Sequence, residues 1–188
     1  MDIYTIIQES LERAASLPDE GKELREIHRN RSKNLVEALA SAFRSGLVSQ
    51  PTVRVLSKHS DANREEFGLN ELLFDVLVCD TGKTASAKRE AELTFVTKAL
   101  WVVESEMARD SREALFDFNK LVLATSENKL FIGPQVSDEE TFLATLLSPA
   151  RYCNAMVFVA LVPHPDQWRA APLSVHLWQL ESSQWRRE

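Results

Sequence analysis

Residues 71–79 read Glu-Leu-Leu-Phe-Asp-Val-Leu-Val-Cys and are apolar at positions of both parities. Such a run is typical of a β-strand that is covered on both faces. Strands of this kind occur in sheets that carry helices on both sides, so the run predicts an α/β or mixed α+β fold. It also makes Asp75 conspicuous, because an isolated carboxylate in such a strand costs several kcal/mol unless a partner compensates.

Two more acids interrupt the next strand-like run, residues 93–107, which we expect to bend near Lys98 because it is long. Period-two geometry sends Glu104 and Glu106 to one face of that strand. In an antiparallel hairpin Asp75 would lie opposite or diagonal to Glu104, with side-chain roots roughly 5–8 Å apart. Clustered carboxylates repel, and Mg²⁺ or Mn²⁺ would supply the missing charge. Alternatively, Asp75 pairs with an arginine or lysine and Glu106 lies in solvent.

The remaining elements follow from apolar spacing and from turn residues. Helices are predicted over 3–17, 22–45, 110–125 and 137–147, and further strands over 52–58, 128–132, 155–162 and 173–180. The pattern contains no internal repeat and no domain boundary. We therefore expect one domain over 1–188 with a mixed sheet.

The order helix, strand, strand with Asp75, strand with Glu-x-Glu, helix with Lys120, strand spans about residues 22–134. This order resembles the PD-(D/E)XK, restriction-endonuclease-like superfamily. The resemblance implies an αβββαβ core preceded by an N-terminal helix. Residues 135–188 would then add a helix and strands that extend the sheet.

The resemblance also implies roles for individual side chains. Asp75 and Glu104 would be the metal ligands, with Glu37 on the preceding helix as an accessory acid. Glu106 would occupy the place that a lysine usually holds in the motif, and Lys120 on the following helix could supply that charge. Mg²⁺ or Mn²⁺ would be the cofactor, and the reaction would be hydrolysis of a phosphodiester in nucleic acid.

The chain departs from the family pattern at two places. Phe74 precedes the aspartate where the motif has proline, and the third strand carries no lysine. A catalytically inactive relative would keep the same fold, and a lone lysine on a helix is often only a surface residue. The alternative function is thus a protein-binding module, with this fold or another α+β fold, that catalyses nothing.

The charge balance limits how nucleic acid could bind. A net charge of -6 argues against binding through the overall field, because such binding neutralises phosphates. Local basic patches would have to neutralise the phosphates. A basic cluster can also be simply the solvent-exposed face of a helix. The candidate nucleic-acid-binding residues are Arg29, Arg31, Lys33, Lys83, Lys88 and Arg89. DNA is favoured over RNA as the partner.

Hydrophobic residues make up 44% of the chain and charged residues 27%, the composition of a soluble globular protein. No apolar run reaches the ~20 residues of a membrane-spanning helix. The sequence begins without a basic leader or a long apolar segment, so we expect a cytoplasmic protein. The sequence leaves open whether the chain forms a homodimer.

Overall fold

The computed structural model describes residues 2–47, 49–58, 63–68, 72–87, 92–170 and 172–188. The strands are β1 (Val53–Ser57), β2 (Val76–Ala85), β3 (Glu92–Ser105), β4 (Asn128–Pro134), β5 (Met156–Val162), β6 (His176–Glu181) and β7 (Gln184–Arg187). The helices are α1 (Ile3–Ser16), α2 (Leu24–Gly46), α3 (Arg64–Phe67), α4 (Ser111–Leu123) and α5 (Glu139–Ala150). All of these strands belong to one seven-stranded sheet, in which they lie in chain order.

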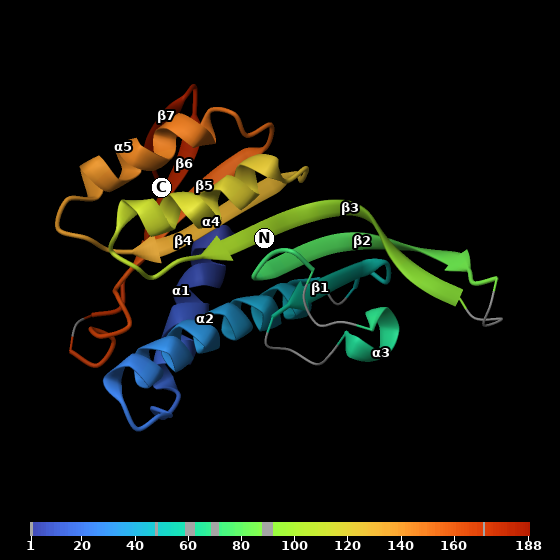
Figure 1. The fold of residues 1–188 in the computed structure, drawn as a ribbon, viewed down its shortest axis with the longest axis horizontal. Helices are drawn as coiled ribbons and strands as arrows, with labels where there is room; N and C mark the ends of the chain where they lie inside the picture. Colours follow the sequence, from blue (N-terminus) through green and yellow to red (C-terminus); the bar gives the residue numbers. More distant parts are fainter. Residues whose placement is uncertain (1, 48, 59–62, 69–71, 88–91, 171) are drawn as a thin grey trace.

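The sheet is mixed. Strands β1, β2 and β3 form an antiparallel meander, β3, β4 and β5 run parallel to one another, and β6 and β7 return antiparallel. Helices α4 and α5 connect the parallel pairs, since parallel neighbours need a crossover connection. The mixed α/β fold class predicted from the sequence is confirmed at this level. The β2–β3 hairpin extends beyond the rest of the sheet (Figure 1).

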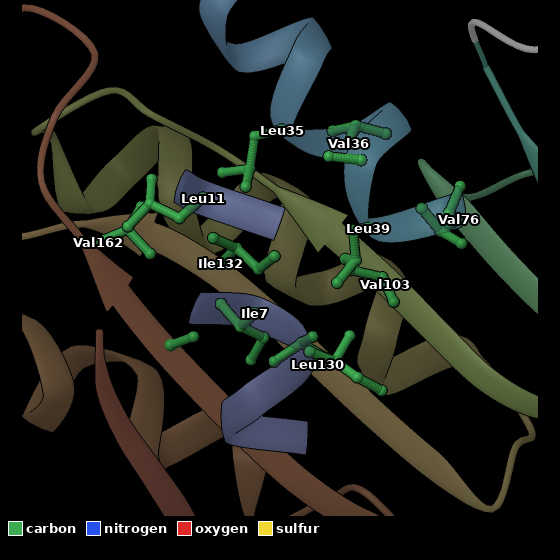
Figure 2. Packing of buried hydrophobic residues seen from close by; sticks show 14 of the residues in the cluster. Ile7, Leu11, Leu35, Val36, Leu39, Val76, Val103, Leu130, Ile132 and Val162 are labelled. Carbon is green, nitrogen blue, oxygen red and sulfur yellow. The ribbon is translucent and has the colours of Figure 1, made fainter. Parts of the chain in front are cut away.

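Helices cover both faces of the sheet, with α1 and α2 on one side and α4 and α5 on the other (Figure 1). Each face has its own hydrophobic core. Figure 2 shows the α1–α2 side, where Ile7 and Leu39 meet Val103, Leu130 and Ile132 of the central strands. Strands β4 and β5 are thus buried on both faces along almost their whole length, as their apolar sequences predict. Strands β2 and β3 are buried only where they lie within the body of the sheet, at residues 76–79 and 102–104.

Local sequence accounts for where the helices begin and which face they bury. Asp2 caps α1 by accepting hydrogen bonds from the N–H groups of Tyr4 and Thr5, and Ile7 and Leu11 are fully buried one turn apart. The same 3.6-residue spacing directs the buried face of α2 to the sheet. Among the described residues, no helix combines the length and apolar character needed to cross a membrane.

One predicted strand begins later than its sequence suggests. The apolar run 71–79 was expected to be extended throughout, but β2 begins only at Val76. Leu73 is exposed and has a φ of 68°, in the left-handed region that an extended strand excludes. Asp75 therefore stands immediately before β2 and not within it. The chain turns into the sheet at this point, which places the carboxylate at a strand end.

Strand β3 is irregular where the sequence predicts a bend. Its pairing with β2 shifts register twice, between the partners of Val78 and Cys79 and between those of Asp80 and Thr81. These β-bulges lie on either side of Lys98. A bulge bends a strand and increases its twist, so the far part of the hairpin can leave the plane of the sheet.

Candidate active site

Two carboxylates meet where β2 begins and β3 ends. Val76 pairs with Val103, and extending this antiparallel register by one residue sets Asp75 opposite Glu104. The carboxylate of Asp75 accepts a hydrogen bond of 3.0 Å from the N–H of Ser105. Burial raises the pKa of Asp75, while the Ser105 N–H and the charges of Lys120 and Lys58 act in the opposite direction. The predicted neighbourhood of these two acids is therefore present in the structure.

Glu104 is the most unusual of these residues. Its side chain is only 1% exposed, yet it extends from a strand between Val103 and Ser105 into the layer beneath α4. One carboxylate oxygen accepts a hydrogen bond of 3.0 Å from Lys120 Nζ. The other oxygen, Oε1, is buried and has no hydrogen-bond partner among the residues that the structure describes. Burial, followed by the negative charge of Asp75, raises the pKa of Glu104 to about 8. A cation placed beside this carboxyl group would therefore lower its pKa and favour its charged form.

Lys120 reaches the acids from α4. The helix is capped by Asp110, which accepts a hydrogen bond from the N–H of Arg112, and Lys120 lies near its C-terminal end. Its ammonium group contacts Glu104 and also Asp117, the latter at 2.7 Å. Burial alone would lower the pKa of Lys120, but its hydrogen bonds to the two carboxylates raise it above its ordinary value. Lys120 thus carries a permanent positive charge at this point.

Glu106 stands two residues beyond Glu104, just after the end of β3. Its Oε1 accepts a hydrogen bond of 2.6 Å from the N–H of Ala108, which fixes the orientation of the carboxyl group. Burial raises the pKa of Glu106, and the neighbouring Asp117 raises it further. The group is half-buried, so it does not lie free in solvent as the alternative interpretation of the sequence suggested. Asp117 was not predicted, although it stands one helical turn before Lys120.

Glu37 is placed differently from the prediction. Its Oε1 accepts a hydrogen bond of 2.8 Å from Ser57 Oγ, and Arg44 lies beside the same hydroxyl at 3.2 Å. Ser57 pairs with Val76, so Glu37 is close to Asp75 along the sheet, but it approaches from the α2 side. The structure therefore provides Glu37 with other partners and does not join it to Glu104.

The predicted basic residues separate into different environments. Arg29 and Lys33 are exposed on α2 and line a pocket that also includes Asp75. Arg31 is 9% exposed and forms two hydrogen bonds with Asp19, at 2.7 and 2.8 Å. It also donates to the carbonyl oxygen of Pro165. The guanidinium of Arg31 is thus already bonded inside the protein, which disfavours the predicted contact with nucleic acid.

The remaining basic candidates lie far along the hairpin. Lys83 is exposed near the end of β2, where Nζ donates a hydrogen bond of 2.7 Å to Thr94 Oγ1. It is eight residues from Asp75, about 26 Å along an extended strand. The structure does not bring it to the carboxylates. Lys88 and Arg89 lie outside the described residues.

The donor set fits a hard divalent cation in part. Carboxylate oxygens are the ligands that Mg²⁺ and Mn²⁺ prefer, and Glu104 Oε1 is a buried oxygen without a partner. Within the described ranges, however, no three His, Cys, Asp or Glu side chains are grouped so that they could hold a metal ion. Mg²⁺ commonly binds through one or two carboxylates and fills its other positions with water and substrate phosphate. Asp75 and Glu104 would supply those two carboxylates.

Comparisons with known proteins do not assign a role to this site. No family model matches the sequence, and neither a curated protein nor a solved structure is significantly similar to it.

Proposed function

We propose that the protein is a divalent-metal-dependent nuclease, with a catalytic centre built from Asp75, Glu104, Glu106 and Lys120. The observation that carries the proposal is the Glu104 carboxyl group, which is buried beside Asp75 with one oxygen on Lys120 and the other without a partner. Such an arrangement costs folding free energy, and active sites are where such costs are commonly found.

The order of elements supports the same proposal. Helix α2, strands β1, β2 and β3, helix α4 and strand β4 follow one another with an antiparallel meander and one parallel crossover. That is the order implied by the resemblance to the PD-(D/E)XK superfamily. In this interpretation β5 to β7 and α5 extend the sheet, and α1 completes the layer under it.

The side chains divide the chemistry of hydrolysis between them. Asp75 and Glu104 would hold Mg²⁺ or Mn²⁺, which when bound polarises a phosphoryl oxygen and lowers the pKa of water. Lys120 keeps a positive charge beside the place where negative charge develops during attack on phosphorus. Glu106, with its raised pKa and fixed orientation, is the group suited to accept the proton of the attacking water. Cleavage forms a P–O bond to the oxygen of the attacking water and breaks one ester P–O bond, and the departing oxygen takes up a proton from solvent.

Cleavage assays test this proposal directly. Plasmid DNA and labelled single-stranded DNA and RNA are incubated with the purified protein and Mg²⁺, Mn²⁺ or EDTA. Wild type is expected to cleave at least one substrate only when metal is present. Asp75→Asn and Glu104→Gln should each lower the rate at least a hundredfold. Glu140→Gln, a matched change of an exposed residue on α5, should leave it unaltered.

Two results would contradict the proposal. One is equal cleavage by wild type and Asp75→Asn, which would mean that a contaminant or another site is responsible. The other is the absence of metal-dependent cleavage on all substrates. Asp75→Asn and Glu104→Gln each replace a buried or half-buried acid by a neutral group of the same shape, so loss of the fold does not explain loss of activity.

A second candidate, a non-catalytic protein that binds another protein, is favoured by a different observation. Leu73 and Leu123 are 79% and 87% exposed and flank an apolar pocket between the β2–β3 hairpin and α4. Exposed apolar patches of this kind are often binding surfaces. A wild-type protein inactive in all cleavage assays would favour this second candidate.

A further inference from the structure

A basic pocket lies on the α2 side of the sheet end, next to Asp75. It has a volume of about 450 Å³ and is lined by Arg29, Asn30, Ser32, Lys33, Val36, Lys58, Asp75 and Ser105. Three of these residues are cations and one is an acid, in a chain whose net charge is -6. The local charge of the pocket is thus opposite to that of the protein.

The cations come from two elements and converge on one space. Arg29 and Lys33 stand four residues apart on α2, so they share a face of the helix. Lys58 directly follows β1 and contributes a favourable charge to Asp75. Within the described part of the chain, neither Arg29 nor Lys33 has a hydrogen-bond or ion-pair partner. Their charge is therefore available to an anion in the pocket.

Ser105 supplies an independent observation. Its hydroxyl oxygen is buried and has no hydrogen-bond partner in the described ranges of the chain, although its N–H is bonded to Asp75. The other polar groups of the pocket wall are used, since Asn30 donates to the carbonyl oxygen of Glu20 and Ser32 to that of His28. Such a hydroxyl can still donate a hydrogen bond to a bound anion.

We infer that this pocket binds a phosphate group of the nucleic acid, held by Arg29, Lys33 and Lys58, with the Ser105 hydroxyl as a further donor. The inference rests on the proposed function, because it assigns to the pocket the phosphate next to the one that is cleaved. Two sources share this chemistry: a terminal phosphate monoester and an internal phosphodiester. A monoester carries about twice the charge of a diester near neutral pH, so three cations suit a phosphorylated end particularly well.

Binding without metal tests the inference. Anisotropy is measured in EDTA and low salt for labelled 12-nucleotide DNA with a 5′-phosphate, a 3′-phosphate or only hydroxyl ends. Lys33→Gln and Lys58→Gln are each expected to weaken binding about tenfold. Each should also reduce the slope of log K against log salt concentration by the amount that about one phosphate contact contributes. Arg186→Gln, which removes the same charge from β7 at the opposite edge of the sheet, should change binding less than twofold. Ser105→Ala should weaken it a few-fold.

The outcomes separate the pocket from the catalytic proposal. If a strand with a 5′- or 3′-phosphate binds more tightly than the strand with hydroxyl ends, the pocket binds a terminal phosphate. If all three strands bind equally and Lys33→Gln weakens their binding, the pocket binds an internal phosphate. Equal effects of Lys33→Gln and Arg186→Gln, or no binding by wild type, would overturn the inference. Asp75→Asn should bind at least as tightly as wild type, because it removes the acid from the pocket, while losing cleavage. If wild type binds DNA through this pocket but never cleaves it, phosphate binding by the pocket is supported and the nuclease activity is excluded.

Discussion

Replacement of Glu104 by glutamine should stabilise the protein at alkaline pH. Glutamine has the same shape and no charge, so it removes the cost of keeping a carboxylate beneath α4 beside Asp75. The pKa of Glu104 rises from an ordinary 4.5 to about 8 in the folded protein. Since the folded state retains a proton that the unfolded chain has lost, wild-type stability should fall as pH rises from about 4.5 to about 8.

The size of this effect follows from the same shift. At about 1.4 kcal/mol per pH unit, the interval corresponds to about 5 kcal/mol of unfolding free energy above pH 8. We therefore expect Glu104→Gln to be several kcal/mol more stable than wild type at pH 9. Below pH 4 the two proteins should differ by less than about 1 kcal/mol, because the wild-type carboxyl is then neutral in both states.

Urea unfolding at a series of pH values measures this difference. Each curve gives an unfolding free energy by linear extrapolation, and the variant is compared with wild type at the same pH. Glu140→Gln, an exposed residue on α5, serves as the control and should give a small difference that is independent of pH. A Glu104→Gln difference that stays constant from pH 4 to pH 9 would refute the reasoning, because Glu104 would then keep its ordinary pKa.

Three further substitutions test other parts of the structure. Lys120→Met should destabilise by about 1–3 kcal/mol at pH 8, because it removes the ammonium partner of Glu104, whereas Lys98→Met on the exposed hairpin should leave the unfolding free energy almost unchanged; similar losses would contradict the buried pair. Arg31→Met should lower the unfolding free energy by about 2–4 kcal/mol without weakening DNA binding in anisotropy, and the reverse result would return Arg31 to the nucleic-acid surface. Asp110→Ala should cost about 1 kcal/mol in urea unfolding through loss of the α4 cap, and an unchanged midpoint would exclude that cap.

The order of the elements could be predicted from the sequence because it depends on local patterns. The spacing of Ile7 and Leu11 predicts a helix whatever the rest of the chain does, and strands covered on both faces have continuous apolar sequences. The start of β2 could not be predicted in this way. Residues 72–74 are as apolar as the strand itself, and only the backbone at Leu73, with its positive φ, shows that the chain turns there.

Part of the site could have been predicted more accurately. Arg31 stands four and eight residues before Leu35 and Leu39, which places it on the buried face of α2, whereas Arg29 and Lys33 fall on the exposed face. Helical spacing therefore contained the signal that separates them.

Other features of the site depend on contacts between distant segments. Ser57 bonds to Glu37 and Asp19 bonds to Arg31, and no local pattern indicates those pairings. The unpartnered hydroxyl of Ser105 is likewise visible only after β3 and α2 are assembled. Tertiary packing decides these features, so a sequence pattern alone could not assign them.

We propose that Asp75 and Glu104 together hold a divalent metal ion. A crystal grown with Mn²⁺ and measured near the manganese absorption edge would locate any bound ion by its anomalous signal. We expect one peak about 2.1–2.2 Å from a carboxylate oxygen of each residue, and its loss in Asp75→Asn crystals. A peak elsewhere, or none while Lys120 remains the only cation on Glu104, would contradict it.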